Sequence, residues 1–553
     1  TSVVIRSFMA HHQGMMLLTL GNLLLDRSMV DRFHADKRIR SAELLLQERV
    51  PERPALVLHA AAAPLRMQDP DQRLKAPQRT FRAPHPPLPE VCVLSNGSFT
   101  TVVTASGNGY LSSDGLAVTR WREDACDDAW GIGVYIRDVE RETVWSAAWH
   151  PTGTAGDEYA AEFSLEQARF MRRDGDIRTA MDICAAAEGN AEIRRITITN
   201  RGGTARLLEA TTFVELALAE PAADAAHPAF SKLFIETAFD GEREALLARR
   251  RPRSPGDRPV WAVHGLICGE AAGPVEYETD RARFIGRGGS MREPRAICER
   301  LTGTTGAVID PIFAVRRRFT VPPGGQAKLI VVTGTAESRE DALELYGRFS
   351  TAQQVERAFQ LAWTRSRIEL HHLHMQTAEA TLCHVLAGRV LYAPPLRPER
   401  AEALDGGPYA QSGLWPLGIS GDLPIVLVKA YDTAGAGTAA ELVRCHEWLR
   451  RAGVLFDLVF LIETPGGYHQ ELRDRITRLI GQSVPRMYDH RPGRAYALSS
   501  DQLRGEEIRQ LVASARVVLR LDGSSLRAQL RVMSAVGKTP APAFKPLAAA
   551  EEP

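Results

Sequence analysis

The chain has 553 residues, of which 44% are hydrophobic and 24% are charged, proportions typical of a soluble globular protein with several domains. Its formal net charge of +1 argues against a nucleic-acid partner, because proteins that bind nucleic acid usually concentrate basic residues on one face. Seven dispersed cysteines without a Cys-x-x-Cys pair argue against a disulfide framework and favour a reducing cytosolic setting, and no apolar run reaches the ~20 residues that span a bilayer.

The N-terminal region, residues 1–50, predicts helices that belong to a larger body. Residues 15–25 are apolar almost all round, which is typical of a helix buried within a protein. A second helix is expected over Arg38–Arg49. Because the chain starts at Thr1, without an initiator methionine and within this pattern, we expect a fragment of a longer protein. Residues 51–90 are rich in proline and predict a linker.

Residues 91–336 predict antiparallel β-structure. Short β-branched or alternating runs are separated by turn residues, such as those of the segment 200–203. Strands that follow one another without intervening helices favour a sandwich, and the length of this region favours a large two-layered super-sandwich. The clearest strand-like runs are Phe99–Thr104, Gly133–Arg137, Ile193–Thr199, Leu207–Val214, Phe313–Thr320 and Lys328–Val332.

Helical patterns return in residues 337–422, where we expect linker helices and the start of a helical region. Residues 423–533 alternate apolar strand-like segments with helices, which indicates a small parallel α/β unit. The tail, residues 534–553, is rich in proline and alanine and predicts disorder. The sequence therefore predicts a multidomain α+β protein: an N-terminal helical remnant, a large antiparallel β super-sandwich, linker helices and a small parallel α/β unit.

Three polar residues at the head of the first apolar helix are candidates for binding sugar hydroxyls. His11, His12 and Gln13 could line the floor of a pocket. They could equally cap the helix or find partners within a core, because buried polar groups usually have internal hydrogen bonds.

A second candidate is the charged segment 118–131, which contains Trp121 and Trp130. An aromatic ring offers a flat apolar face to a sugar, and carboxylates and guanidinium groups can bind its hydroxyls. The alternative is a surface loop with mutual ion pairs and Trp130 in the core, and composition does not decide between the two. The candidate substrate-binding residues of this segment are Arg120, Trp121, Arg122, Glu123 and Asp124.

Asp422 and Glu463 are the candidate catalytic carboxylates. Asp422 ends a glycine-rich turn that also contains Trp415, and both of these are candidates for substrate contact. Glu463 follows a strand, at the edge where open α/β sheets place ligands. Hydrolysis of a glycosidic bond generally needs two carboxylates that flank it, but the spacing does not show that these two converge. Without a G-x-G-x-x-G or G-x-x-x-x-G-K-[ST] loop, we expect no nucleotide cofactor in this chain, and we expect no metal site.

Several long motifs are specific enough to suggest a family. They are Phe8–Met15, Leu94–Gly97, Thr119–Asp124, Pro221–Leu233, Tyr277–Phe284 and Gly413–Pro424. In this order they resemble cyclic β-1,2-glucan synthases, and the similarity runs from the start of the chain to about residue 530. The first motif resembles the end of a glucoamylase-like domain, so residues 1–50 would be its C-terminal helices. The others resemble the sugar-phosphorylase-type (glycosyltransferase family 36) sandwich that follows.

This resemblance implies a multidomain parent enzyme at the bacterial inner membrane, with this chain on the cytoplasmic face and soluble in isolation. It implies UDP-glucose as the donor of a transferase domain and inorganic phosphate for a phosphorylase part. The implied partners are β-1,2-glucan or a related glucooligosaccharide and the remaining domains of the parent, and a homodimer through the sandwich is a further expectation. Phosphorylases of this type use one Asp from a helical barrel as a proton donor. Here an α/β unit follows Asp422 instead, so we expect a first, inactive sandwich repeat.

Three functions are therefore considered. The first is a carbohydrate-binding and scaffolding part of a cyclic β-1,2-glucan synthase. The second is a self-sufficient β-glucan phosphorylase or glycoside hydrolase that uses Asp422 and Glu463. The third is a structural spacer domain.

Overall fold

The chain forms two compact units, Thr1–Leu74 and Lys75–Pro553. The helix expected over Arg38–Arg49, the linker up to residue 78 and the tail from residue 535 lie outside the described residues. The computed structural model describes residues 10–36, 79–252, 254, 257–394, 398–405, 409–431, 435–463, 468–483 and 492–534.

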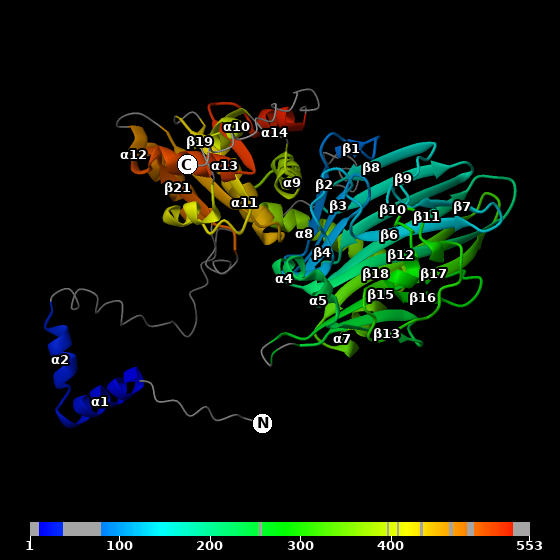
Figure 1. The fold of residues 1–553 in the computed structure, drawn as a ribbon, viewed down its shortest axis with the longest axis horizontal. Coiled ribbons are helices and arrows are strands. Elements are labelled where there is room, and N and C mark those ends of the chain that lie inside the picture. Colours follow the sequence, from blue (N-terminus) through cyan, green and yellow to red (C-terminus); the bar gives the residue numbers. More distant parts are fainter. Residues whose placement is uncertain are drawn as a thin grey trace, which may run out of the picture. The chain divides into compact units, whose positions relative to one another are not determined.

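The described residues of the first unit, 10–36, form two short helices, α1 (Ala10–Leu24) and α2 (Ser28–His34), drawn in blue in Figure 1. The side-chain oxygen of Asn22 accepts hydrogen bonds from the backbone N–H groups of Met29 and Val30, which holds the turn into α2. No residue of α1 is buried. The sequence predicts burial of this apolar helix, and no residue described in this unit provides it.

The first sheet of the second unit has nine antiparallel strands (Figure 1). The strand at its edge, β1, corrects the prediction that residues 51–90 form a linker. β1 pairs with β8, and Phe81 of β1 packs on the sandwich core. In spatial order the strands are β1 (Arg79–Phe81), β8 (Glu158–Phe163), β9 (Ala168–Asp174), β10 (Ile177–Ala185), β11 (Ala191–Asn200), β18 (Gln326–Ala336), β15 (Val260–Cys268), β14 (Ala245–Arg250) and β13 (Ile235–Asp240).

The second sheet is also antiparallel and is built around the long strand β12 (Arg206–Ala219), which is buried along almost its whole length. β12 pairs with β17 on one side and with β5 and β6 on the other, so the sheet divides there. Its other strands are β16 (Glu276–Asp280), β17 (Pro311–Val321), β5 (Leu116–Thr119), β4 (Gly109–Ser113), β3 (Phe99–Thr104), β2 (Val91–Ser95), β6 (Ile132–Asp138) and β7 (Thr143–Ser146).

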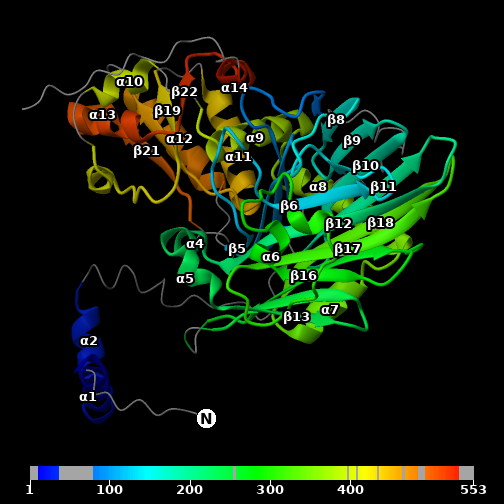
Figure 2. The same cartoon turned by 45° about the vertical axis from the view of Figure 1, so that its right-hand side comes forward.

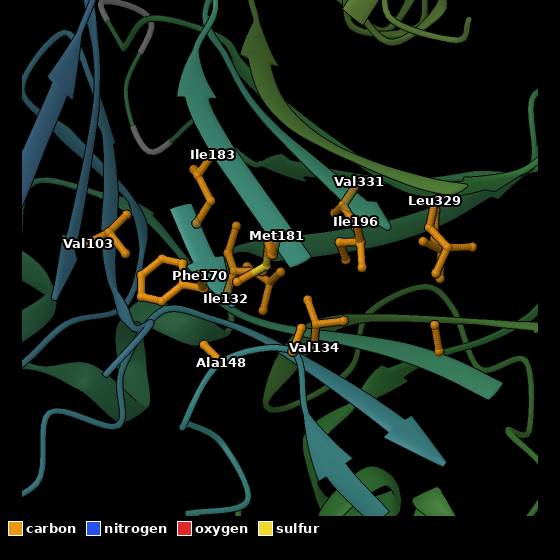
Figure 3. Close-up of a cluster of buried hydrophobic side chains, with 14 of the residues drawn as sticks. Val103, Ile132, Val134, Ala148, Phe170, Met181, Ile183, Ile196, Leu329 and Val331 are labelled. Carbon is orange, nitrogen blue, oxygen red and sulfur yellow. The ribbon is translucent and has the colours of Figure 1, made fainter. Parts of the chain in front are cut away.

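The sandwich core lies between these two sheets. Side chains alternate along each strand, so one face of each sheet can be apolar while the other carries polar groups. Figure 3 shows Met181, Ile196 and Val331 of the first sheet near Ile132 and Val134 of β6 in the second. The expected β super-sandwich is confirmed.

Helices cover part of the outer face of the first sheet. α7 (Arg339–Gly347) and α8 (Ala352–His372) pack on the outward side chains of β10, β11, β14, β15 and β18. α9 (Thr377–Leu391) then packs against β2 and against the helices of the α/β unit. These three helices confirm the linker helices expected after the sandwich.

Residues 425–521 form a four-stranded parallel sheet in the order β21-β20-β19-β22. Its strands are β19 (Ile425–Ala430), β20 (Asp457–Ile462), β21 (Ala495–Ser499) and β22 (Val517–Leu521). One face packs on α9, α11 (Ala436–Arg451), α12 (Tyr468–Ser483) and α14 (Leu526–Ser534). The other face packs on α10 (Pro398–Leu404), the 3-10 helix η3 (Gln411–Leu417) and α13 (Gly505–Ser514). This doubly covered sheet confirms the expected parallel α/β unit.

Candidate functional site

The segment 120–131 connects β5 to β6 and forms one side of a pocket of about 260 Å³. At its start the Arg120 N–H donates to the Glu215 carbonyl over 2.9 Å, and at its end the Gly109 N–H donates to the Trp130 carbonyl over 2.7 Å. The segment is therefore attached to the sheet at both ends. The pocket is lined by Asp124, Asp127, Ala129, Trp130, Gly131, Phe213, Glu215, Arg281 and Met291.

Gly131 fixes the position of the pocket wall. Its φ is +113°, a region that side chains rarely adopt, and a Cβ there would come within 3 Å of three backbone atoms of Gly109. The chain can therefore pass this close to β4 only with glycine at position 131.

Behind the pocket, a buried ion-pair cluster holds the start of the segment. Arg120, whose side chain is 4% exposed, donates to Asp224 through Nε at 3.2 Å and Nη2 at 3.0 Å. Arg122 Nη2 donates to the same carboxylate at 2.7 Å. Asp224 is 1% exposed and lies on α4 (Pro221–Ala226), which contacts β12 (Figure 2). Burial of Asp224 opposes ionisation, but the hydrogen bonds from the two arginines outweigh it and lower the pKa of this carboxyl.

The pocket carries carboxylates, a guanidinium group and an indole ring. Arg281 Nε donates to Glu215 Oε1 at 2.7 Å, which orients both groups along the wall. Asp127 lies 3.6 Å from Arg292 and 3.4 Å from the buried ring of His150. Trp130 is partly exposed and supplies an apolar surface. These are the groups that sugar recognition needs: an aromatic surface, hydroxyl acceptors and a forked donor.

Of the residues predicted from the segment 120–124, only Asp124 lines this pocket. Its carboxylate also accepts backbone N–H bonds from Cys126 and Asp127, so it helps to shape the loop. Arg120 and Arg122 bind Asp224 instead, and the prediction that Arg120 contacts a ligand is corrected because its guanidinium group is buried within the protein.

Trp121 and Glu123 face the α/β unit. Trp121 packs on Tyr110 and Tyr392, with ring centroids 5.4 and 5.9 Å away. Glu123 Oε2 accepts a hydrogen bond from Arg516 Nη2 at 2.6 Å. Trp121 therefore packs between the sandwich and the end of α9, and Glu123 connects the sandwich to the α/β unit, roles that composition did not indicate.

Asp422 and Glu463 do not converge. β19 and β20 run parallel, with Ile425 opposite Asp457 and Ala430 opposite Ile462. Asp422 precedes β19 and Glu463 follows β20. Asp422 therefore lies at the amino ends of the parallel strands and Glu463 at their carboxyl ends, separated by about 16 Å along the strand direction. Two carboxylates that cleave one glycosidic bond lie roughly 5–9.5 Å apart. The hypothesis of a catalytic pair is therefore wrong on geometry.

Each of these two carboxylates has a local partner. Asp422 Oδ1 accepts a hydrogen bond from Gln411 Nε2 at 2.9 Å, and Glu463 lies 3.4 Å from Lys429 Nζ. Trp415, on the same turn as Asp422, is 63% exposed and donates to the Ser420 carbonyl. Its exposed ring keeps Trp415 a candidate for sugar contact.

His11, His12 and Gln13 lie exposed on α1, in the first unit. The rings of the two histidines are 4.1 Å apart. In the described parts of the chain, no three His, Cys, Asp or Glu side chains form a group that could hold a metal ion. Of the helices described, none combines the length and the hydrophobicity needed to cross a bilayer.

The paired antiparallel sheets around one core place the second unit in the class of β super-sandwiches. The chain belongs to the glycosyl hydrolase 94 supersandwich domain family, whose model matches residues 75–352.

Three curated relatives are similar to this chain. Cyclic beta-(1,2)-glucan synthase NdvB of Rhizobium meliloti (strain 1021) is 32% identical over 534 residues, 95% of this chain and 19% of that protein. Solabiose phosphorylase of Paenibacillus borealis is 24% identical over 252 residues, 45% of this chain and 32% of that protein. N,N'-diacetylchitobiose phosphorylase of Vibrio proteolyticus is 23% identical over 266 residues, 47% of this chain and 32% of that protein. The chain thus spans less than a third of the length of each relative.

Proposed function

We propose that this chain is a carbohydrate-binding and scaffolding part of a cyclic β-1,2-glucan synthase. The observation that carries the proposal is the similarity to the Rhizobium meliloti synthase over 95% of the chain. An alignment of that extent has to include most of the parallel α/β unit as well as the sandwich. The two phosphorylases, by contrast, align with about half of the chain.

The pocket beside the segment 120–131 is the site that we assign to sugar binding. Glu215 and Arg281 hold each other in place, so their remaining hydrogen-bonding capacity is oriented before a ligand arrives. Trp130 offers an apolar surface beside them. The ligand that fits this combination is an uncharged sugar unit, with β-1,2-glucan as the expected source.

The remaining expectations for the parent enzyme belong to the same proposal. They are UDP-glucose as donor, phosphate for a phosphorylase part, location at the cytoplasmic face of the inner membrane and a homodimer through the sandwich. The apolar surface of α1, with Met15, Leu17 and Leu23 exposed, fits a helix that packs against another domain of such a parent.

Replacing Trp130 by Ala is expected to weaken binding of a β-1,2-glucooligosaccharide by about 2 kcal/mol, a factor of roughly thirty. Truncation removes the indole ring from the pocket wall but leaves the pair of Glu215 and Arg281. Isothermal titration calorimetry measures the change, with Trp130→Phe expected to retain most of the affinity. Trp415→Ala tests the other exposed tryptophan that is a candidate for sugar contact, and a loss of affinity confined to this variant would place the binding site at the turn of Asp422 instead. Absence of binding heat at millimolar oligosaccharide would favour the structural spacer instead.

Replacing Asp422 by Asn or Glu463 by Gln is expected to leave the consumption of inorganic phosphate in the presence of β-1,2-glucan, and the release of reducing sugar from the glucan, at the background level of the unchanged chain. The two side chains lie at opposite ends of the parallel strands and cannot act on one bond. Turnover by the unchanged chain that either substitution abolishes would restore the phosphorylase or hydrolase hypothesis.

A further inference from the structure

A second depression lies on the outer face of the first sheet, where α7 and α8 leave it uncovered. It is a groove of about 690 Å³ over β9, β10, β11 and β18, and the first turn of α8 forms one wall. The small side chains of Ala180, Thr197 and Thr199 form part of its floor and leave room above the sheet. In the pairing register Ala180 lies opposite Thr197, and Thr197 lies opposite Lys328.

One end of the groove is organised by a buried carboxylate. Asp182 is 8% exposed and accepts hydrogen bonds from Arg169 Nε at 2.6 Å and Arg195 Nη2 at 2.8 Å. Arg195 also donates to Glu356 at 2.8 Å and lies over the ring of Phe359. Both arginines are therefore held in fixed orientations by neighbours on the sheet and on α8.

The other two cations of the groove have no such partner. Arg178 contacts the Met171 sulfur at 3.7 Å. Among the described residues neither Arg178 nor Lys328 forms an ion pair, although both line the groove. In total the lining carries four cations and two carboxylates, Asp182 and Glu356, which leaves two uncompensated positive charges.

The register of the strands places Arg178 and Lys328 in the same part of the groove. Arg178 lies opposite Thr199, and Lys328 lies opposite Thr197, on the two sides of β11. The two residues are separated by two strand spacings across the sheet and by two residues along it. Their Cα atoms therefore lie about 12 Å apart, with the two threonines between them. Side chains as long as arginine and lysine can meet over such a gap.

We propose that this groove binds a phosphate group, carried by a sugar phosphate or supplied as inorganic phosphate, between Arg178 and Lys328 above Thr197 and Thr199. A phosphate monoester carries a charge of about −1.5 to −2, which matches the two uncompensated cations, whereas a carboxylate would neutralise one of them. The threonine hydroxyls can donate to phosphate oxygens, and the N-terminus of α8 adds a favourable potential for an anion. The site is separate from the pocket at segment 120–131 and uses a different ligand.

The test is calorimetric titration of the full chain, at low salt and in a buffer without phosphate, with inorganic phosphate, glucose 1-phosphate and glucose. The double variant Arg178→Gln/Lys328→Gln is expected to raise Kd for both phosphate ligands at least tenfold. Both side chains are exposed, so the fold is retained, and circular dichroism checks this. Arg141→Gln/Arg258→Gln removes the same charge from two other exposed positions and is expected to change Kd less than twofold.

Equal affinity for the two phosphate ligands indicates that phosphate alone is recognised, and tighter glucose 1-phosphate indicates added contacts to the sugar; both support the proposal. Three results overturn it: no saturable binding at millimolar phosphate ligand, unchanged Kd in the groove variant, or equal loss in the control variant. None of these depends on whether uncharged β-1,2-glucan binds at Trp130.

Discussion

Replacing Asp224 by Asn is expected to destabilise the sandwich by about 3 kcal/mol, because the substitution leaves the buried guanidinium of Arg120 without its closest counter-charge. The remaining carboxylates near Arg120 are farther away, with Glu215 at 3.7 Å and Asp310 at 4.0 Å. These two carboxylates compensate part of the charge of Arg120. The loss of stability therefore falls at the lower end of the range expected when one partner of a buried ion pair is removed. Scanning calorimetry measures the effect as a fall in Tm of roughly 6–12 °C.

The matched control is Asp114→Asn. Asp114 is exposed and has a φ of +47°, a conformation that asparagine adopts as readily as aspartate. We expect a change within about 0.5 kcal/mol. An equal fall in Tm for both variants would mean that the cluster of Arg120, Arg122 and Asp224 does not stabilise the sandwich.

The same cluster predicts a pH dependence. The pKa of the Asp224 carboxyl is lower in the folded protein than in the unfolded chain, so its stabilising contribution is present above about pH 4. This contribution is lost as the pH falls through the folded-state pKa. The difference in Tm between the unchanged protein and Asp224→Asn should therefore be constant at neutral pH and shrink below about pH 4. A difference that stays constant down to pH 2.5 would contradict this assignment.

Replacing Gly131 by Ala is expected to cost about 2–4 kcal/mol and to displace the wall of the pocket. The added Cβ would meet the backbone of Gly109, which cannot move without disturbing β4 and its pairing with β3. Because Trp130 and Gly131 both line the pocket, affinity for a β-1,2-glucooligosaccharide should fall together with stability. Calorimetry measures both quantities on the same protein.

Gly115→Ala separates backbone strain from the clash. Gly115 also has a positive φ, +86°, but a Cβ there meets nothing within 4 Å. This variant should show only the conformational cost of about 1 kcal/mol and unchanged glucan affinity. If the two alanine variants lose equal stability, close approach to Gly109 is not what requires glycine at position 131.

The sequence predicted the elements well because each depends on local periodicity. The β-branched run Phe99–Thr104, for example, became a strand with the same bounds. The run Leu207–Val214 was predicted too short. β12 continues past Glu215 to Ala219, where it pairs with β5, and a partner that far away in the chain leaves no local pattern.

The candidate site was predicted less well. The segment 118–131 was found from its charges and tryptophans, but only the part from Asp124 onward lines the pocket, including Asp127 and Trp130. Glu215 and Arg281 complete the pocket from β12 and α6 (Arg281–Ile285), and no signal near the segment points to either of them. Arg120 looked like a ligand-binding residue because composition cannot distinguish an exposed arginine from one buried against an aspartate.

What the sequence determined by itself is the order and type of the elements, because the side-chain period that makes a helix or a strand is written within a few neighbouring residues. Its long motifs also indicated the family. What only the tertiary structure decided is which side chains meet. The parallel register of β19 and β20 separates Asp422 from Glu463, and the antiparallel register of β10, β11 and β18 brings Arg178 and Lys328 to one groove. Register and strand order depend on contacts between residues far apart in the chain, so no local pattern specifies them.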